Sequence, residues 1–512
     1  MIEKIVIANR GEIAVRIIRS CREMGIRSVA LFSEADRMSK HVMLADEAYP
    51  IGPAPSKESY LDVDKIIETA LKCGADAVHP GYGFLSENAG FARKCEVAGI
   101  TFIGPRAETI ERMGDKISAR RSMTEAGVPV VPGIQRQLES ATEAERICRE
   151  IGLPVILKAA SGGGGKGMRL IRSESEIGEA YAAAKSEALS SFGDETVYIE
   201  KYIEEPHHIE FQILGDAHGN IVHLYDRECS VQRRHQKIVE ESPSPFLTDE
   251  LRQEMGKTAA AAARAVGYVG AGTIEFLVDK NRNFYFLEMN TRLQVEHPVT
   301  EEVLGLNLVK EQIYIASGRP LHLRQTDIVQ RGHSIECRIC AEDAAAGFMP
   351  SPGPIRQLSE PGGPGVRIDG YVYEGYDIPI HYDPMISKLI VRATTREYAV
   401  QRMRAALDEY KVTGIKTNIS YLNAIMHTPD FVRGGYDTAF LEKNEKIIHR
   451  YLREPFPAGA DDRLVEDLVL IAAQIDYLVM QQEGGGSSPA AADTGTLNRW
   501  REFGKRKGVM GI

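Results

Sequence analysis

The sequence predicts an α/β protein, α+β overall, that begins with a doubly wound parallel sheet domain. Up to about residue 104, short apolar runs alternate with helical patterns, as parallel strands connected by helices require. The chain has 512 residues, 43% of them hydrophobic. At about 150 residues per domain this is enough for roughly three or four ordinary cores. We therefore expect the N-terminal sheet to be the first of several domains.

The N-terminal alternation opens with the apolar run 4–8, followed by a turn at Gly11 and a helical pattern through Ile13, Ile17 and Cys21. The pattern then repeats along the chain. It predicts strands at 28–32, 75–79 and 101–104 and helices at 62–72 and 89–97.

The first strand is not followed by a dinucleotide-binding fingerprint. A Rossmann site would carry G-x-G-x-x-G at this turn, whereas the segment NRGEIA supplies one glycine. We therefore expect Glu34 and Asp36, at the end of the second strand, to be ordinary loop acids.

Composition and charge exclude several classes of protein. The formal net charge is -10, whereas nucleic-acid and membrane-surface proteins usually need a concentrated positive field. No apolar stretch approaches the roughly 20 residues that cross a bilayer, and the charged opening MIEKIVIANRGE is not a signal peptide. Seven scattered cysteines, an odd number, are typical of a reduced compartment. We expect a cytoplasmic protein with no nucleic-acid or membrane partner.

A glycine-rich segment, SGGGGKG at 161–167, lies between an apolar strand at 153–160 and a second strand at 168–172. Backbone N–H groups in such a hairpin can close over phosphates because no side chain obstructs the approach. A P-loop would need Lys-Ser/Thr and a following helix, but Met168 begins a strand. A flexible loop explains the glycines equally well.

The later segments alternate again, and Pro129, Pro132 and Gly133 mark a boundary before them. A third compact region begins near His333 and contains a strand in ISKLIVRAT. The predicted elements are strands at 209–214 and 221–226, helices at 249–266 and 396–410, a hairpin at 272–290, an amphipathic helix at 461–480 and a linker at 483–496.

The hairpin at 272–290 carries the clearest candidate metal site. A two-residue turn at Asn281 and Arg282 places Glu275 directly opposite Glu288, with Asn290 on the same face. Opposed like charges are destabilising, and a bound Mg²⁺ or Mn²⁺ removes the penalty. The alternative is an exposed face with solvated acids, but the apolar neighbouring residues favour a metal site.

The next segment, TRLQVEHPVT, places Arg292, Gln294 and Glu296 on one side of an extended chain. An arginine fork can recognise bicarbonate or a carboxylate, and a nearby glutamate can accept its proton. The alternative is a surface ion pair between Arg292 and Glu296, which spacing alone favours.

Single charged residues and the Cys-x-x-Cys pair are weaker indications of a functional site. Lysines 116, 158, 201 and 237 could neutralise phosphates, but lone lysines are usually solvated. His208 and His235 lack zinc spacing and are interpreted as structural or nucleotide-contacting groups. Cys337 and Cys340 face opposite sides of a strand, which leaves Arg338 as the residue of interest.

The motifs together resemble the biotin carboxylase family over residues 1–446. The strings are IANRGEIAVRIIR, HPGYGFLSEN, KAASGGGGKGM, EMNTRLQVEHPVTE and GHSIECRICAED. The resemblance implies an ATP-grasp architecture: an α/β domain at 1–115, an ATP-grasp domain at 116–332 with a mobile glycine-rich lid at about 133–203, a biotin carboxylase C-terminal domain at 333–446, and a tail at 447–512.

The resemblance also implies the substrates, ATP with Mg²⁺ (or Mn²⁺), bicarbonate and biotin, and a role for each motif residue. The metal would be held by Glu275, Glu288 and Asn290. The residues implied in ATP binding are Lys116, Lys158, Gly164, Gly165, Glu200, Lys201, Ile203, His208, His235, Glu275 and Glu288.

For bicarbonate, the implied ligands are Lys237, Arg292, Gln294 and the Val295 backbone, with Glu296 as the base. The product, carboxyphosphate, releases CO₂ beside biotin, and Arg338 stabilises the biotin enolate. Tyr82 and Arg338 would bind biotin, and the catalytic group is Lys237, Arg292, Glu296 and Arg338.

The partners follow from the resemblance and from one absence. The family's biotin acceptor lies in a Met-Lys dipeptide, which this chain lacks, so we expect a separate biotin carboxyl carrier protein, a carboxyltransferase and a homodimer. The predicted function is the first half-reaction of an acyl-CoA (acetyl-CoA) carboxylase. The alternatives are the corresponding subunit of pyruvate carboxylase, another ATP-grasp ligase, and a non-catalytic ATP-binding scaffold.

The tail at 447–512 combines the apolar seam of 461–480 with the basic ending LNRWREFGKRKGVMGI. Tryptophan and arginine are typical of interface hot spots, so we expect the tail to dock another protein of the complex. The alternative is that the helix packs on its own C-terminal domain.

Overall fold

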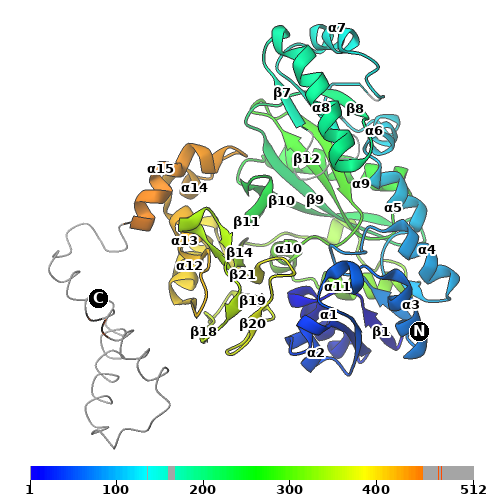
Figure 1. Cartoon of the computed structure of the whole chain (residues 1–512), viewed down its shortest axis with the longest axis vertical. Coiled ribbons are helices and arrows are strands. Elements are labelled where there is room, and N and C mark those ends of the chain that lie inside the picture. Colours follow the sequence, from blue (N-terminus) through cyan, green and yellow to red (C-terminus); the bar gives the residue numbers. More distant parts are fainter. Residues whose placement is uncertain (1, 135, 160–167, 454–470, 472–473, 475–512) are drawn as a thin grey trace, which may run out of the picture. The chain divides into compact units, whose positions relative to one another are not determined.

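The computed structural model describes residues 2–134, 136–159, 168–453, 471 and 474 (Figure 1). Met1–Leu452 form one compact unit, and Arg453–Ile512 form a second. The predictions for Gly164 and Gly165, for the helix at 461–480 apart from Ile471 and Gln474, and for the basic C-terminal end lie outside the described residues. In the described part of the chain, no helix has the length and apolarity needed to cross a bilayer.

The N-terminal sheet has five strands in the order β3-β2-β1-β4-β5, and every pairing is parallel. Ile5 and Ile7 of β1 pack with Ile13 and Ile17, while Val6 packs on the opposite side in a separate core. Both faces are therefore buried, which confirms the doubly wound sheet. The elements are β1 (Lys4–Ile7), α1 (Gly11–Glu23), β2 (Arg27–Ser33), α2 (Lys40–Leu44), β3 (Glu47–Gly52), α3 (Val63–Lys72), β4 (Ala77–His79), α4 (Ala89–Val97), β5 (Thr101–Phe102), α5 (Ala107–Gly114) and α6 (Lys116–Glu125).

The prediction for Asp36 was wrong. Glu34 is exposed, as expected of a loop acid, but Asp36 is fully buried. Its carboxylate accepts hydrogen bonds from Arg10 Nε at 2.6 Å and from the Tyr60 hydroxyl at 2.7 Å. Burial alone would raise the Asp36 pKa, but Arg10 lowers it to about 2. Asp36 therefore holds the N-terminal end of α1 beside β2.

The region predicted as a lid is a small sheet of three strands in the order β7-β6-β8, which shares one core with two helices. Lys158 pairs with Met168 across β6 and β7, so the strands flanking the glycine-rich segment are antiparallel neighbours as predicted. The elements are α7 (Ala141–Ile151), β6 (Val155–Ala159), β7 (Met168–Ile171), α8 (Ile177–Phe192) and β8 (Val197–Lys201).

The central sheet has eight strands in the order β13-β12-β9-β10-β11-β14-β21-β19. It continues without a break through the β11–β14 pairing, across the predicted boundary at 332. β10 runs to Arg233, well beyond the predicted end at 226. The elements are β9 (His207–Gly215), β10 (Ile221–Arg233), β11 (Gln236–Ser242), α9 (Asp249–Ala265), β12 (Gly270–Val278), β13 (Phe284–Asn290), α10 (His297–Leu304), α11 (Leu308–Ala316), β14 (His333–Cys340), β19 (Val366–Gly370) and β21 (Met385–Ala393).

The β12–β13 hairpin has the predicted pairing but a different turn. Glu275 lies opposite Glu288, as expected. The loop is closed between Asp279 and Asn283, so it holds three residues rather than two, with Arg282 at φ 66°. A register shift between Glu275 and Phe276 compensates for the longer loop.

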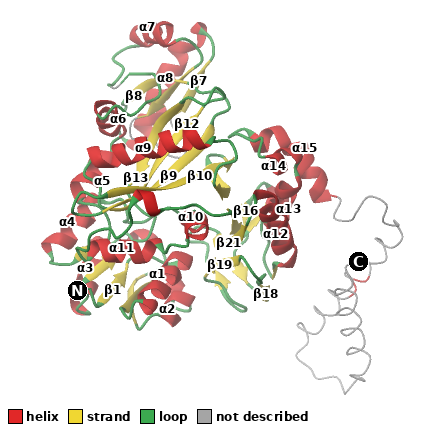
Figure 2. Ribbon diagram, turned by 180° about the vertical axis from the view of Figure 1, so that it is seen from behind, coloured by secondary structure: helices red, strands yellow, loops and turns green. Residues whose placement is uncertain are grey.

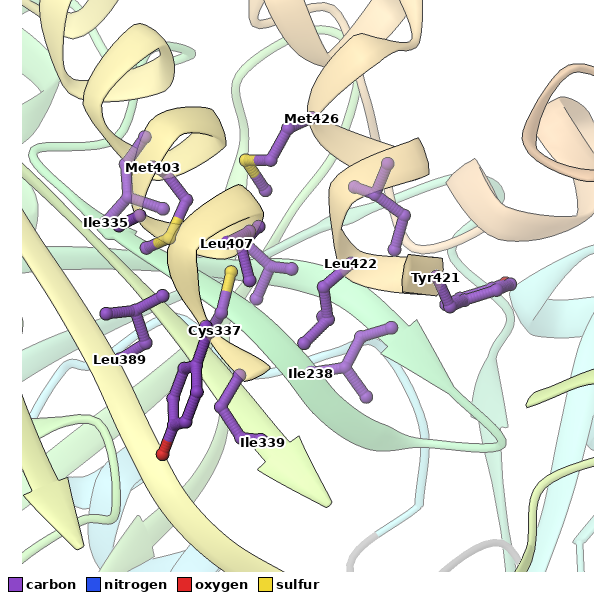
Figure 3. Close-up of a cluster of buried hydrophobic side chains, with 14 of the residues drawn as sticks. Ile238, Ile335, Cys337, Ile339, Leu389, Met403, Leu407, Tyr421, Leu422 and Met426 are labelled. Atoms are coloured by element: carbon purple, nitrogen blue, oxygen red, sulfur yellow. The ribbon is translucent and has the colours of Figure 1, made fainter. Parts of the chain in front are cut away.

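The C-terminal part of the sheet is two-sided. Ile335, Cys337 and Leu389 point to one face, where they pack on Met403 and Leu422 (Figure 3). The helices of this layer gather beside the sheet in Figure 2. Cys337 is buried and Cys340 partly buried, and both are free thiols. The elements are β15 (Glu342–Asp343), β16 (Met349–Pro350), β17 (Gly353–Pro354), β18 (Gln357–Ser359), β20 (Asp377–Ile378), α12 (Arg396–Glu409), β22 (Lys411–Thr413), α13 (Ile419–His427), α14 (Pro429–Arg433) and α15 (Phe440–Arg453).

Helix α15 crosses the predicted start of the tail at residue 447. Ile448, on this helix, is fully buried in the same core as Phe440. The first residues of the predicted tail therefore continue the C-terminal layer.

Candidate active site

The opposed carboxylates of the β12–β13 hairpin have different surroundings. Glu275 is buried and accepts hydrogen bonds from Asn290 Nδ2 at 2.8 Å and Gln294 Nε2 at 2.9 Å. The Glu288 residue, opposite it, is exposed at the surface of the hairpin. Desolvation by the surrounding protein and the like charge of Glu275 raise the Glu288 pKa. The repulsion within this pair is therefore only partly compensated.

Lys237, on β11, lies at the centre of three buried carboxylates. Its Nζ is 2.7 Å from Glu210, 3.0 Å from Glu275 and 2.6 Å from Glu296. Burial opposes its positive charge, but the three carboxylates raise the Lys237 pKa well above its usual value. The ammonium is therefore charged, and it joins the hairpin to the segment that follows it.

The segment 291–296 brings its polar residues back to the hairpin. Arg292 Nη1 donates to Gln294 Oε1 at 2.9 Å, and Nη2 donates to Asn290 Oδ1 at 2.9 Å. The acid that pairs with Arg292 is Glu87, 2.8 Å from Nε, rather than Glu296. The surface ion pair within this segment, the alternative from spacing, is therefore not formed.

Glu296 is fully buried between two cations. Lys237 lies on one side, and Arg338 Nη2 is 3.1 Å from Glu296 Oε2 on the other. Burial favours the neutral acid, but Lys237 and Arg338 outweigh it and hold the Glu296 pKa far below its usual value. Arg338 also donates from Nε to Glu240 at 2.6 Å. Arg338 and Glu296 therefore come together from positions 42 residues apart.

Among the residues predicted to contact a nucleotide, Lys116 lies at the start of α6, and Lys158, Glu200 and Lys201 lie on the small sheet. Lys158 Nζ is 2.7 Å from Glu200, and Lys201 Nζ donates to the carbonyl oxygens of Gly152 and Leu153. Burial lowers the pKa of Lys116, while Glu288 opposes that shift. Lys116 therefore lies near the β12–β13 hairpin, and Lys158 and Lys201 lie within the small sheet.

His208 belongs to the central cluster, whereas the other two predicted nucleotide residues do not. His208 Nε2 is 2.7 Å from Glu275, and its other ring nitrogen contacts Gln232. His235 is exposed in the turn between β10 and β11, and Ile203 is half-buried after β8. The prediction of a nucleotide contact for those two residues stays open.

Tyr82 is connected to helix α1 and to strand β21. Its hydroxyl donates to Glu12, at the start of α1. Lys388 Nζ, on β21, lies 5.9 Å from the centre of the Tyr82 ring. Tyr82 therefore interacts with two buried charged side chains, Glu12 on α1 and Lys388 on β21.

The sequence did not predict several of the ion pairs of the site, although Glu210 had been considered beside His208 as a possible metal ligand. Glu210 and Glu240 are fully buried partners of Lys237 and Arg338, and Arg227 donates to Glu210 from Nε at 2.5 Å. Arg120 donates both to Glu200 and to the Val131 carbonyl. A charged residue within an apolar strand was the available signal, because such residues are buried only when paired.

The hairpin fits a divalent cation. Two carboxylates face each other, and the Asn290 amide lies beside them on the same face. Oxygen ligands of this kind suit Mg²⁺ or Mn²⁺, with phosphate oxygens completing the shell. Desolvation and the like charge of Glu275 both raise the Glu288 pKa, and a cation bound between the two carboxylates would favour the ionised form of Glu288.

Comparison with known families gives three matches. Residues 1–110 match the model of the biotin carboxylase N-terminal domain, and residues 336–443 match that of the biotin carboxylase C-terminal domain. Residues 115–324 match the ATP binding domain of the carbamoyl-phosphate synthase L chain. Together these models cover most of the chain.

Individual relatives are similar over nearly their whole length. The biotin carboxylase of Haemophilus influenzae is 54% identical over 444 residues, which is 86% of this chain and 99% of the relative. A pyruvate carboxylase subunit of Methanothermobacter thermautotrophicus is 54% identical over 469 residues, 91% of this chain and 95% of the relative.

Solved structures show the same fold. The biotin carboxylase domain dimer of Hydrogenobacter thermophilus 2-oxoglutarate carboxylase, in complex with MgADP, ADP and bicarbonate, is 50% identical with a TM-score of 0.84. It covers 88% of this chain and 99% of its own. The Campylobacter jejuni biotin carboxylase complex with βγ-ATP is 49% identical with a TM-score of 0.84, over 86% of this chain and 99% of its own. The chain therefore belongs to the biotin carboxylase family of ATP-dependent ligases.

Proposed function

We propose that the chain uses ATP and bicarbonate to carboxylate biotin that a separate carrier protein presents. The observation that carries this proposal is the buried position of Glu296 between Lys237 and Arg338, beside the opposed Glu275 and Glu288. This arrangement supports a mechanism in which a base, an anion site and a metal site lie next to one another.

ATP is held by the residues that the sequence predicts to contact a nucleotide. Lys116 and Lys158 neutralise phosphate charge, and Glu200, Lys201, Ile203, His208 and His235 contact the nucleotide. Gly164 and Gly165 belong to the lid that covers the phosphates. Mg²⁺ bound by Glu275, Glu288 and Asn290 supplies charge neutralisation between the phosphates and the hairpin.

Bicarbonate is held by Lys237, Arg292, Gln294 and the Val295 backbone. Glu296 then accepts the bicarbonate proton while the bicarbonate oxygen attacks the γ-phosphorus, which forms carboxyphosphate and releases ADP. Glu296 is a weak base while both Lys237 and Arg338 contact it. Bicarbonate takes over hydrogen bonds from Lys237 and so raises the proton affinity of Glu296.

Biotin is carboxylated in the second step. Carboxyphosphate breaks into CO₂ and phosphate, and the phosphate removes the N1 proton of biotin. Arg338 stabilises the negative charge on the ureido oxygen, and N1 then attacks CO₂. Tyr82 is the second residue that binds biotin.

The partners of this reaction are a biotin carboxyl carrier protein, a carboxyltransferase and a second copy of the chain. The dimer in the Hydrogenobacter thermophilus structure supports the homodimer. The absence of a Met-Lys dipeptide from the sequence supports the separate carrier.

For the final acceptor we propose acyl-CoA, with acetyl-CoA first, as the resemblance of the sequence motifs to the biotin carboxylase family implies. A 2-oxo acid acceptor is the second candidate, because the alignment with the Methanothermobacter pyruvate carboxylase protein spans 469 residues against 444. Purification of the native complex, followed by assays with acetyl-CoA, pyruvate and 2-oxoglutarate, separates the two. Carboxylation of a 2-oxo acid alone contradicts the acyl-CoA proposal.

The activity itself is tested with purified protein, MgATP, bicarbonate and free biotin. We expect bicarbonate-dependent ATP cleavage that biotin stimulates. Another ATP-grasp ligase would share the metal acids but would not respond to biotin. Phosphate release that biotin leaves unchanged therefore rejects the biotin carboxylase function.

A further inference from the structure

One face of the C-terminal half of the central sheet carries a row of buried charges. Residues alternate along β14 and β21, so Glu336, Arg338 and Lys388 point away from the apolar core that Figure 3 shows. Helices α1 and α10 contact the sheet here. Lys388 is fully buried and lies directly opposite Arg338 in the strand register. A buried ammonium is costly unless it is paired, so its partners define its role.

Lys388 has two such partners, and they belong to different segments. Its Nζ donates to the Val295 carbonyl oxygen at 2.6 Å and lies 3.1 Å from Glu12 Oε1. Glu12 in turn accepts the hydrogen bond of the Tyr82 hydroxyl. Burial lowers the proton affinity of Lys388, but Glu12, Glu336 and Asp369 together outweigh this and raise its pKa, so it is a cation. A single charge thus connects Val295, Tyr82 and the strand beside Arg338.

We propose that Lys388 is a positioning residue that fixes the bicarbonate segment and the biotin-contacting tyrosine relative to Arg338. This inference rests on the proposed function, which assigns Val295 to bicarbonate and Tyr82 to biotin. The β14–β21 ladder sets the separation of Lys388 and Arg338. The ammonium holds the Val295 peptide at a fixed distance from the strand that contains Lys388. Through Glu12 it holds Tyr82 in the same way. Transfer of CO₂ to biotin requires such alignment, because small displacements of the reacting groups strongly lower the reaction rate.

A merely structural clamp between α1 and the sheet would have different kinetic consequences. Within the described residues, the hydrogen bonds and ion pairs of Lys388 reach none of the side chains proposed to hold ATP. Loss of the ammonium is therefore expected to weaken the binding of bicarbonate and biotin and to leave the binding of ATP unchanged. A structural clamp would lower thermal stability without distinguishing among the three substrates.

The test compares Lys388→Met with the wild-type full-length chain, using free biotin as the acceptor. Methionine keeps most of the length of the side chain and removes the charge. We expect the KM values for bicarbonate and biotin to rise roughly ten-fold or more while the KM for ATP stays within about two-fold. Unchanged KM values for bicarbonate and biotin, or an equal rise in all three, would overturn the proposal.

Arg252→Met is the matched control, because Arg252 is a buried cation on α9 whose Nε lies 2.8 Å from Asp226. It should lower the melting temperature without separating the three KM values. If Lys388→Met does not fold, Lys388→Gln keeps a donor but is too short to bridge Glu12 and Val295, and the same criteria apply. Absence of biotin-stimulated ATP cleavage in the wild type contradicts the proposed function instead.

Discussion

Arg338 Nη2 and Glu296 Oε2 lie 3.1 Å apart, although one residue belongs to β14 and the other follows the β12–β13 hairpin. Glu296 is fully buried and Arg338 is partly buried, and Glu240 holds the Arg338 guanidinium from the other side. The proposed base of the first step and the proposed oxyanion-stabilising group of the second therefore share one ion pair. Substitutions of the two residues should affect different steps.

Glu296→Gln removes the proposed base and keeps its size. We expect turnover to fall by roughly 10²-fold or more, since loss of a general base has this effect, while ATP binding changes little. Bicarbonate-dependent phosphate release and nucleotide titration measure the two quantities. Wild-type turnover in this variant would remove Glu296 from the mechanism.

Arg338→Ala should impair carboxylation of biotin more than bicarbonate-dependent ATP cleavage, because Arg338 acts after carboxyphosphate forms. The ratio of carboxybiotin to phosphate produced measures this uncoupling. An equal loss of both activities would place Arg338 in the first step.

Glu288→Gln tests the metal site. In the absence of Mg²⁺ the variant should melt no lower than the wild type, because one of two opposed like charges is removed. The Mg²⁺ concentration that half-saturates ATP cleavage should rise roughly ten-fold. An unchanged Mg²⁺ dependence would show that Glu288 is not a ligand.

Glu336→Gln should change how stability depends on pH. Glu336 is fully buried, neither carboxylate oxygen has a hydrogen-bond partner within the described residues, and burial raises its pKa well above the usual value. A raised folded-state pKa favours folding at low pH, and this contribution is lost as pH rises through it. The melting temperature of the variant should therefore increase relative to the wild type between pH 5 and pH 8, on the order of degrees.

The control for that experiment is Glu241→Gln, which should show the opposite sign. Burial would raise the Glu241 pKa, but Arg396 and His333 lower it to about 2. The ionised form stabilises the fold above the unfolded-state pKa, and this contribution is lost as pH falls toward 2. The variant should be less stable than the wild type at neutral pH, and the difference should shrink in acid.

Truncation after Arg453, the last residue of α15, tests the proposed docking role of the tail. We expect full activity with free biotin and loss of co-purification with the carrier or carboxyltransferase. The cut falls after α15 because Ile448 is part of the C-terminal core. Retained co-purification would contradict the docking role.

The sequence alone determined the local structure and one long-range feature. Alternation of apolar runs and helical patterns predicted the parallel N-terminal sheet because its inner strands β1, β2 and β4 are buried on both faces. The pairing of Glu275 with Glu288 was also predicted correctly, even though the loop is one residue longer than expected. The register shift in β12–β13 that restores the pairing left no mark in the hydrophobic pattern.

Only the tertiary structure decided which charges share a site. Asp36 was predicted to be a loop acid, Glu210 was considered only as a possible metal ligand beside His208, and Glu240 gave no signal, yet all three are fully buried against arginine or lysine. Lys388 likewise gave no signal. The partners of these residues lie on strands and helices far away in the chain, and their register is set by sheet order and layer packing. Local sequence fixes which face a side chain occupies, but the opposite layer decides what that face meets.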